Sequence, residues 1–179
     1  MKEIIQDKRF KYAILIYSLL AFAFTIYTIN RVRALEDQVI PLLDEGNYEQ
    51  AEEVLSDLEG IIDTYIYQPK FFPNKSLMSV AKHKLHTGKG RLALLNNQVE
   101  EAKEHLLSSA KVSGSPTLNS FGPNMSLAQK LLERNEKEVV LSYFELCGEF
   151  WDEEFDQSDT WEAAISKGEM PDFGPNLIY

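Results

Sequence analysis

The sequence predicts an all-α protein in which one membrane-spanning helix is followed by a helical domain. Three observations lead to this prediction. A run of residues without a charged side chain extends from Tyr12 to Ile29. A helix-turn-helix pattern then recurs three times, and a short amphipathic segment follows it. We therefore divide the chain into a cytoplasmic segment (1–11), a transmembrane helix (12–30), helical repeats (31–151) and an acidic capping helix with a carboxy-terminal tail (152–179).

The apolar run is long enough to cross a bilayer as a helix. At 1.5 Å per residue it spans about 27 Å, close to the thickness of the hydrocarbon core. A cleaved signal peptide is the competing interpretation, but its apolar region normally has about 7 to 15 residues and precedes a small-residue cleavage site. Here Arg33 interrupts the corresponding sequence, Val32-Arg33-Ala34. A buried core helix would need a larger protein around it. We expect the helix to continue to Pro41, because no Gly or Pro intervenes.

Basic residues on the two sides of the run predict its orientation. More of them precede the apolar run than follow it, which favours a cytoplasmic amino terminus. The rest of the chain would then be extracytoplasmic, as in a single-pass protein of a bacterial inner membrane with a periplasmic domain. The residues are Lys2, Lys8, Arg9 and Lys11 on the amino side and Arg31 and Arg33 on the other.

Three segments repeat one pattern of turn and small residues. They read "LLDEGNYEQAEEVLSDL", "LLNNQVEEAKEHLLSSA" and "LLERNEKEVVLSYFELC". In each, a turn residue precedes a small or β-branched residue by five positions, and further apolar residues follow on the same helix face. The aligned residues of the second helices are Ala51, Ala102 and Val140. Those of the first helices, twelve positions earlier, are Val39, Gly90 and Ala128.

These offsets resemble the tetratricopeptide repeat, in which two antiparallel helices cross closely at small residues. The resemblance covers residues 34–151, and it implies a solenoid of three helix pairs whose first helices line a groove for a peptide. The spacings between units are longer than the family's 34 residues, and no unit carries the full motif. A generic helical bundle is the alternative.

Two insertions and a final helix complete the helical domain. The first insertion, "YQPKFFPNKS", carries Phe71 and Phe72 between lysines, and we expect these side chains to contact lipid headgroups or a partner. Packing under the solenoid is the alternative. The second, "VSGSPTLNSFGPN", is a turn-rich loop. After Trp151, a helix from Asp159 to Lys167 would cover the last apolar face of the solenoid.

The distribution of charge suggests where a partner binds. The chain carries a net charge of −10, which argues against nucleic-acid binding. The segment between Asp63 and Glu100 nevertheless contains only basic charges, so the first helix of the second unit would present a basic face. That face could pair with a partner's carboxylates. Its predicted partner-binding residues, continued into the third unit, are Lys84, Thr87, Arg91, Leu94, Gln129 and Leu132.

No pattern in the sequence assembles a catalytic, metal or cofactor site. His83 and His86 lack a third ligand nearby, and His105 lies on another predicted helix, so we interpret all three as surface histidines. The single cysteine, Cys147, occupies a helix-packing position and is expected to act as a small apolar side chain. We therefore expect no enzyme, no metal and no cofactor.

The function that these features favour is a membrane-anchored adaptor that binds a protein or peptide beside the bilayer. Two alternatives stay open. A membrane-bound enzyme would have its site in the two long loops, and an oligomerisation module would associate with copies of itself.

A phrase that occurs twice, "FGPN", raises a separate question about the carboxy terminus. The first copy, from Phe121 to Asn124, is expected to turn the chain into the next helix. The second, from Phe173 to Asn176, lies close to the chain end and has no helix to start. We expect it to dock as an extended tail, either on the basic helix or as a cap on the last helices.

Overall fold

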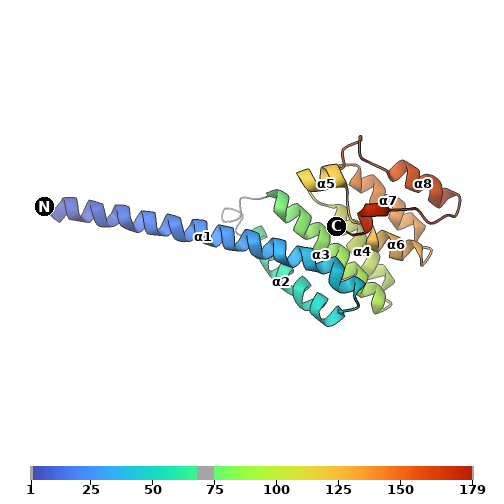
Figure 1. Ribbon diagram of the computed structural model, residues 1–179, viewed down its shortest axis with the longest axis horizontal. Helices are drawn as coiled ribbons and strands as arrows, with labels where there is room; N and C mark the ends of the chain where they lie inside the picture. Colours follow the sequence, from blue (N-terminus) through green and yellow to red (C-terminus); the bar gives the residue numbers. More distant parts are fainter. Residues whose placement is uncertain (1, 68–74, 179) are drawn as a thin grey trace.

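The computed structural model describes residues 2–67 and 75–178, and every regular element in those residues is a helix (Figure 1). The all-α prediction is therefore confirmed, including one long apolar helix at the amino terminus. The eight α-helices and one 3-10 helix are α1 Lys2–Asp44, α2 Tyr48–Tyr67, α3 Lys75–Leu95, α4 Val99–Ala110, α5 Pro116–Phe121, α6 Ser126–Leu132, α7 Lys137–Cys147, α8 Ser158–Ser166 and η2 Gly174–Leu177.

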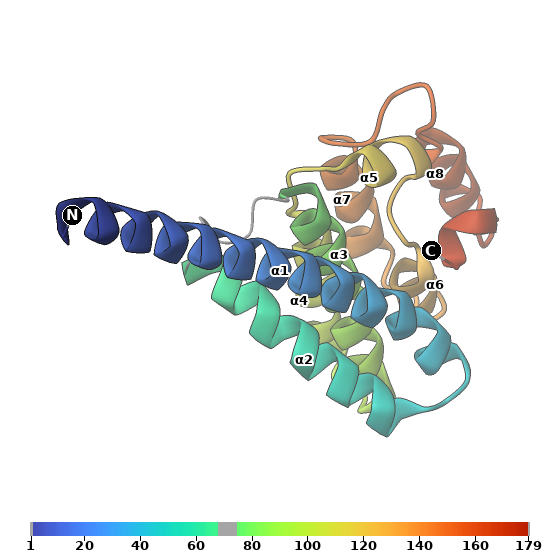
Figure 2. The same cartoon turned by 60° about the vertical axis from the view of Figure 1, so that its left-hand side comes forward.

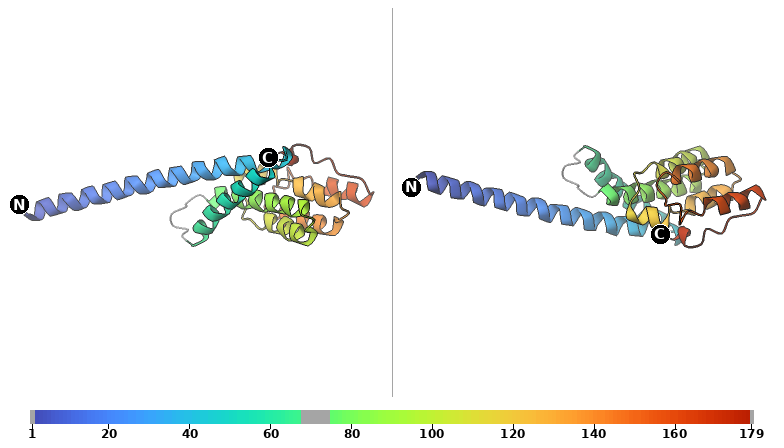
Figure 3. Two further views of the ribbon diagram at one scale, coloured as in Figure 1. Left: turned by 90° about the horizontal axis from the view of Figure 1, so that it is seen from below. Right: turned by 90° about the horizontal axis from the view of Figure 1, so that it is seen from above.

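Helix α1 is a single rod that projects far beyond the helical domain (Figures 1 and 3). Its large apolar side chains from Phe10 to Tyr27 are exposed, whereas from Val32 onward one face is buried. It is the one helix in the described residues that is long and apolar enough to cross a membrane. The predicted continuity is confirmed, and the helix passes through Pro41 to Asp44.

The same turn closes the first helix of each predicted repeat. Gly46, Asn97 and Asn135 all have positive φ angles, of 78°, 60° and 65°. Each turn carries the same pair of backbone hydrogen bonds. In the turn at Asn97, for example, Asn97 N–H donates to the Leu94 carbonyl and Gln98 N–H donates to the Ala93 carbonyl. This is the left-handed helix end that Gly and Asn favour. The same turn therefore recurs at the three positions where the sequence predicts the end of a first helix.

Successive helices pack as antiparallel pairs, α1 with α2, α3 with α4, and α6 with α7 (Figure 2). Helix α3 is central, because it also contacts α1 and α6. The small residues of the predicted repeat lie at these crossings: a Cβ on Gly90 would lie 2.3 Å from a methyl carbon of Leu127 on α6. Ala51, Ala102 and Val140 are completely buried.

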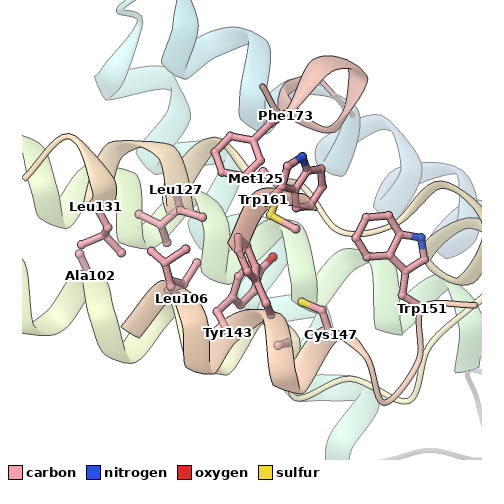
Figure 4. Close-up of a cluster of buried hydrophobic side chains, with 14 of the residues drawn as sticks. Ala102, Leu106, Met125, Leu127, Leu131, Tyr143, Cys147, Trp151, Trp161 and Phe173 are labelled. Atoms are coloured by element: carbon pink, nitrogen blue, oxygen red, sulfur yellow. The ribbon is translucent and has the colours of Figure 1, made fainter. Parts of the chain in front are cut away.

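An aromatic core joins α7, α8 and the carboxy-terminal tail (Figure 4). Trp161 lies between Phe173, with a ring-centroid distance of 4.9 Å, and Trp151, at 5.6 Å. Its Nε1 donates to the Asp172 carbonyl at 3.0 Å. Cys147 is buried in the same core, and burial raises the pKa of its thiol. It is a packing residue, as predicted.

The two "FGPN" copies bind each other. The Asn176 side-chain amide donates to the carbonyls of Phe121 and Pro123, at 2.9 and 3.0 Å, and the backbone carbonyl of Asn176 accepts from Met125 N–H at 2.7 Å. In return, the Asn124 amide donates to the Leu177 carbonyl at 3.2 Å. The tail does dock, but as the 3-10 helix η2 and not as an extended strand. It caps α8 and the first copy, while Tyr179 lies outside the described residues.

Replacing Gly122 with Ala should lower the free energy of unfolding by about 2 to 4 kcal/mol. Its φ is +80°, and a Cβ would lie 2.4 Å from two ring atoms of the buried Trp151. Gly168 controls for the positive φ alone, because its φ is +78° and no atom surrounds its Cβ position, whereas the ψ of 179° at Gly122 also disfavours a side chain. Gly168→Ala should cost only about 1 kcal/mol. Denaturation followed by tryptophan fluorescence would measure both, and equal losses would show that the contact with Trp151 is unimportant.

Candidate functional site

The two basic residues of α3 that we predicted to bind a partner, Lys84 and Arg91, are paired with acidic residues of α1. Lys84 Nζ lies 3.2 Å from Asp37 Oδ1, and Arg91 Nη2 lies 2.7 Å from Asp44 Oδ1. The acids and the bases are each seven residues apart, so the two ion pairs form successive rungs along the seam between α1 and α3. Their matched spacing is a sequence signal that could have predicted the pairing. The expected free basic face is therefore largely neutralised within the chain.

Thr87 and Leu94, two of the predicted partner-binding residues, are buried and not part of an exposed face, and their contact with a partner stays a prediction. Thr87 is 1% exposed, and its hydroxyl donates to the His83 carbonyl at 2.9 Å. Leu94 is 5% exposed and belongs to the core, but it also lines the second cavity described below. The cause is that α3 is covered on several sides by α1, α2, α4 and α6, so one face of it cannot be open along its whole length.

The other predicted partner residues have different positions. Gln129 and Leu132 are half-buried on α6 and line neither of the cavities described below. Phe71 and Phe72 lie outside the described residues, so the prediction about them stays a prediction.

A cavity of about 380 Å³ opens between α1, α3 and the α5 segment, and we call it the Glu36 cavity. Glu36 is only 7% exposed, and its Oε2 has no hydrogen-bond partner. The wall opposite α1 carries the hydroxyl-bearing residues Ser115 and Thr117 and the apolar Leu118. The other charged lining residues are Arg33, Asp37 and Lys84.

Burial controls the ionisation of Glu36. It raises the pKa of the carboxyl group to about 7, with Lys84 and Arg33 acting against this rise and Asp37 adding to it. An unpaired carboxylate inside a protein is costly, and the group responds by holding its proton. At neutral pH, Glu36 therefore exchanges between the acid and the carboxylate.

A second cavity, of about 620 Å³, lies where α1, α3 and α6 end, and we call it the Arg91 cavity. The Arg91 side chain is 11% exposed, and its Nη1 has no hydrogen-bond partner although Nη2 binds Asp44. Tyr48, Leu95 and Arg134 also line this cavity. Arg134 is held in place by bonds to the Leu94 carbonyl and the Asn97 side chain, at 2.8 and 3.1 Å.

The interpretation of the histidines as surface residues is wrong for His83. This ring is 1% exposed, its Nδ1 bonds to the Ser109 carbonyl at 3.0 Å, and its Nε2 accepts from Asn124 N–H at 2.8 Å. Burial lowers the pKa of His83 to about 4, so the ring is neutral. It therefore fixes the first "FGPN" turn onto α3.

The other two histidines form a pair. His86 Nδ1 and His105 Nδ1 lie 3.1 Å apart on α3 and α4, so that one ring donates to the other. Within the described residues, no group of three or more His, Cys, Asp or Glu side chains is arranged to hold a metal ion.

We compared the chain with known protein families, proteins and structures. No protein-family model, curated protein or solved structure matches the chain.

Proposed function

We propose that this protein is a membrane-anchored, tetratricopeptide-like adaptor that binds a peptide or protein segment close to the bilayer surface. The main support is the continuity of α1, whose exposed apolar part runs without a break into the wall of the Glu36 cavity. The α1 residue Glu36 is seven residues beyond Ile29, the end of the apolar run. At 1.5 Å per residue this places it about 10 Å from the hydrocarbon, at the level of the headgroups.

The packing of the helices supports the tetratricopeptide-like part of the proposal. Three antiparallel pairs end their first helices with the same turn, and α3 joins the first helices α1 and α6. In the family that the sequence resembles, these first helices line the peptide groove. Both cavities are lined by residues of these first helices. The ion pairs beside the cavities, Lys84–Asp37 and Arg91–Asp44, both join α1 to α3.

The Arg91 cavity supplies a binding group for such a segment. A buried guanidinium nitrogen without a partner is costly, and a carboxylate of the bound segment would satisfy it by a charge-assisted hydrogen bond. Tyr48 and Leu95 beside it offer apolar area for the same segment. We therefore propose that an acidic side chain or a carboxy terminus of the partner occupies this cavity.

The anchor is proposed to hold the helical domain outside the cytoplasm. A reporter protein fused after Tyr179 should be cleaved by protease added to intact spheroplasts, because four basic residues on the amino side favour a cytoplasmic amino terminus. A reporter at the amino terminus serves as the control and should be protected. Protection of the carboxy-terminal reporter instead would contradict the proposed orientation.

Replacing Arg91 tests the proposed binding function. Arg91→Leu should reduce the amount of partner recovered after crosslinking in intact cells by about tenfold, the loss of one charged hydrogen bond. Lys111→Gln is the control, because this lysine is exposed directly after α4 and lines neither cavity. Helix content by circular dichroism checks folding of both variants. Unchanged recovery from folded Arg91→Leu would contradict the proposal, and recovery of only the chain itself would favour an oligomerisation module.

A further inference from the structure

We propose that the Glu36 cavity is a receptor for a cationic side chain, the ammonium or guanidinium group of a lysine or arginine in the bound segment. This inference deepens the proposed adaptor function and rests on it. The basic residues of α3 suggest that a partner binds through acidic groups. For the Glu36 cavity we infer the opposite, a basic group of the partner.

The first step asks which buried polar atoms between α1 and α3 lack a hydrogen-bond partner. Within residues 2–67 and 75–178, four buried side-chain polar atoms lack a hydrogen-bond partner. Two of them belong to charged residues that line the cavities, Glu36 Oε2 and Arg91 Nη1. A ligand that satisfies the ionised form of Glu36 must donate a hydrogen bond, because a carboxylate oxygen only accepts.

The second step concerns the other charges that face Glu36. From α1, Arg33 and Asp37 line the cavity, and from α3 only Lys84 is charged, since His83 is neutral with both ring nitrogens bonded. Lys84 is paired with Asp37 and does not reach Glu36 within hydrogen-bonding distance. Among the cavity-lining residues that the structure describes, the α5 segment contributes no ionisable side chain. Arg33 and Lys84 thus lie near Glu36 and act to lower its pKa, but its Oε2 has no hydrogen-bond partner.

The third step is the fit of the ligand. A volume of about 380 Å³ admits one long side chain with part of its backbone. Leu77, Val80 and Leu118 offer apolar contacts for the methylene groups of lysine or arginine, and the hydroxyls of Ser115 and Thr117 can accept further bonds. The net charge of −10 would also attract a basic segment.

The two cavities together define a charge pattern for the partner. The rungs Asp37–Lys84 and Asp44–Arg91 are seven helical residues apart, or about 10 Å. An extended peptide covers this distance with about three residues. A segment that binds both cavities would therefore carry a basic residue and an acidic group about three positions apart.

Methyl NMR spectra of the full chain in phosphatidylcholine nanodiscs would test the inference. The probe is N-acetyl-lysine methylamide, and the control is N-acetyl-norleucine methylamide, which keeps the four side-chain carbons of lysine but lacks the ammonium group. The lysine compound should shift the methyl signals of Leu77, Val80 and Leu118 saturably, whereas the norleucine compound should not. Glu36→Gln should weaken this binding at least tenfold, while Glu52→Gln, on the exposed face of α2, should leave it unchanged.

The pH dependence gives a second readout with a defined sign. The cation binds the carboxylate form, and with a pKa of about 7 this form falls from the majority at pH 8 to about 1% at pH 5. Binding should therefore weaken at least tenfold between pH 8 and pH 5 in the wild type, and much less in Glu36→Gln.

Three results would overturn the inference. They are equal shifts with norleucine, lysine binding that survives Glu36→Gln, and shifts on adding phosphatidylethanolamine to the nanodiscs without any probe, which would assign the cavity to a lipid amine. Partner recovery that depends on Arg91 would still support the adaptor function in these cases, so failure of the two proposals is distinguishable.

Discussion

Deletion of residues 171–179 is expected to destabilise the helical domain strongly and not to improve partner binding. The tail contributes Phe173, which is 2% exposed and packs edge-on against Trp161, and Asn176, which bonds to three backbone groups of residues 121–125. Truncating a buried Phe costs about 3 to 5 kcal/mol, and the unpaired groups that remain add to this cost. Phe173→Ala alone should therefore cost about 3 to 5 kcal/mol.

Denaturation of the full chain in uncharged micelles, followed by the fluorescence of Trp151 and Trp161, would measure these losses. Ile178→Ala is the control in the same tail, because Ile178 is 73% exposed and its truncation should change stability by less than about 0.5 kcal/mol. A tail that guards the groove would behave differently. Its deletion would leave the unfolding free energy nearly unchanged and tighten partner binding, and that outcome would contradict the capping role.

The second large effect is expected at His83. His83→Leu leaves the Asn124 N–H and the Ser109 carbonyl without their partners, at about 1 to 3 kcal/mol each. We expect a total loss of about 2 to 5 kcal/mol in denaturation. Lys82→Ala, at the adjacent half-buried position, is the control and should cost less than about 1 kcal/mol. A loss at His83 no larger than at Lys82 would contradict the anchoring role of the ring.

The stability that His83 contributes should also depend on pH. Its pKa is about 4 in the folded protein, and the ordinary value in the unfolded chain is 6.5, so the unfolded chain binds more protons between these values. The contribution is complete above pH 6.5 and is lost as pH falls toward 4. The cost of His83→Leu should therefore shrink by about 2 to 3 kcal/mol between pH 7.5 and 4.5.

Glu36 should show the opposite dependence. Its pKa is raised from 4.5 to about 7, so the folded protein binds more protons between these values and gains stability as pH falls. Glu36→Gln removes this dependence and should stabilise the protein at pH 8 by an amount on the order of 3 kcal/mol, but not at pH 4.5. Equal effects at both pH values would show that Glu36 is not held in a desolvating site.

Much of the local structure could be predicted from the sequence, because local chemistry dictates it. The absence of Gly and Pro before Pro41 predicted the continuous α1, and the aligned turn residues predicted the three left-handed helix ends. The small residues five positions later are buried, as their pattern indicates.

The candidate site could be predicted only in part, since it depends on contacts between distant segments. Lys84 and Arg91 do line the two cavities, but α1 neutralises them with acids 47 positions earlier in the chain. The buried position of His83 depends on a backbone group 41 residues away, and the docking of the second "FGPN" copy depends on the first. Helical spacing shows which residues share a face, but not which neighbour covers that face.

Photocrosslinking in intact cells would test most directly the claim that a partner binds the first-helix face beside the membrane. A photoreactive amino acid at Thr117, which is exposed at the rim of the Glu36 cavity, should crosslink a partner in the membrane fraction. The same group at Glu104, exposed on α4, should not. The Thr117 crosslink should disappear in Arg91→Leu. Equal crosslinking from Thr117 and Glu104, or a Thr117 product that does not depend on Arg91, would contradict the account.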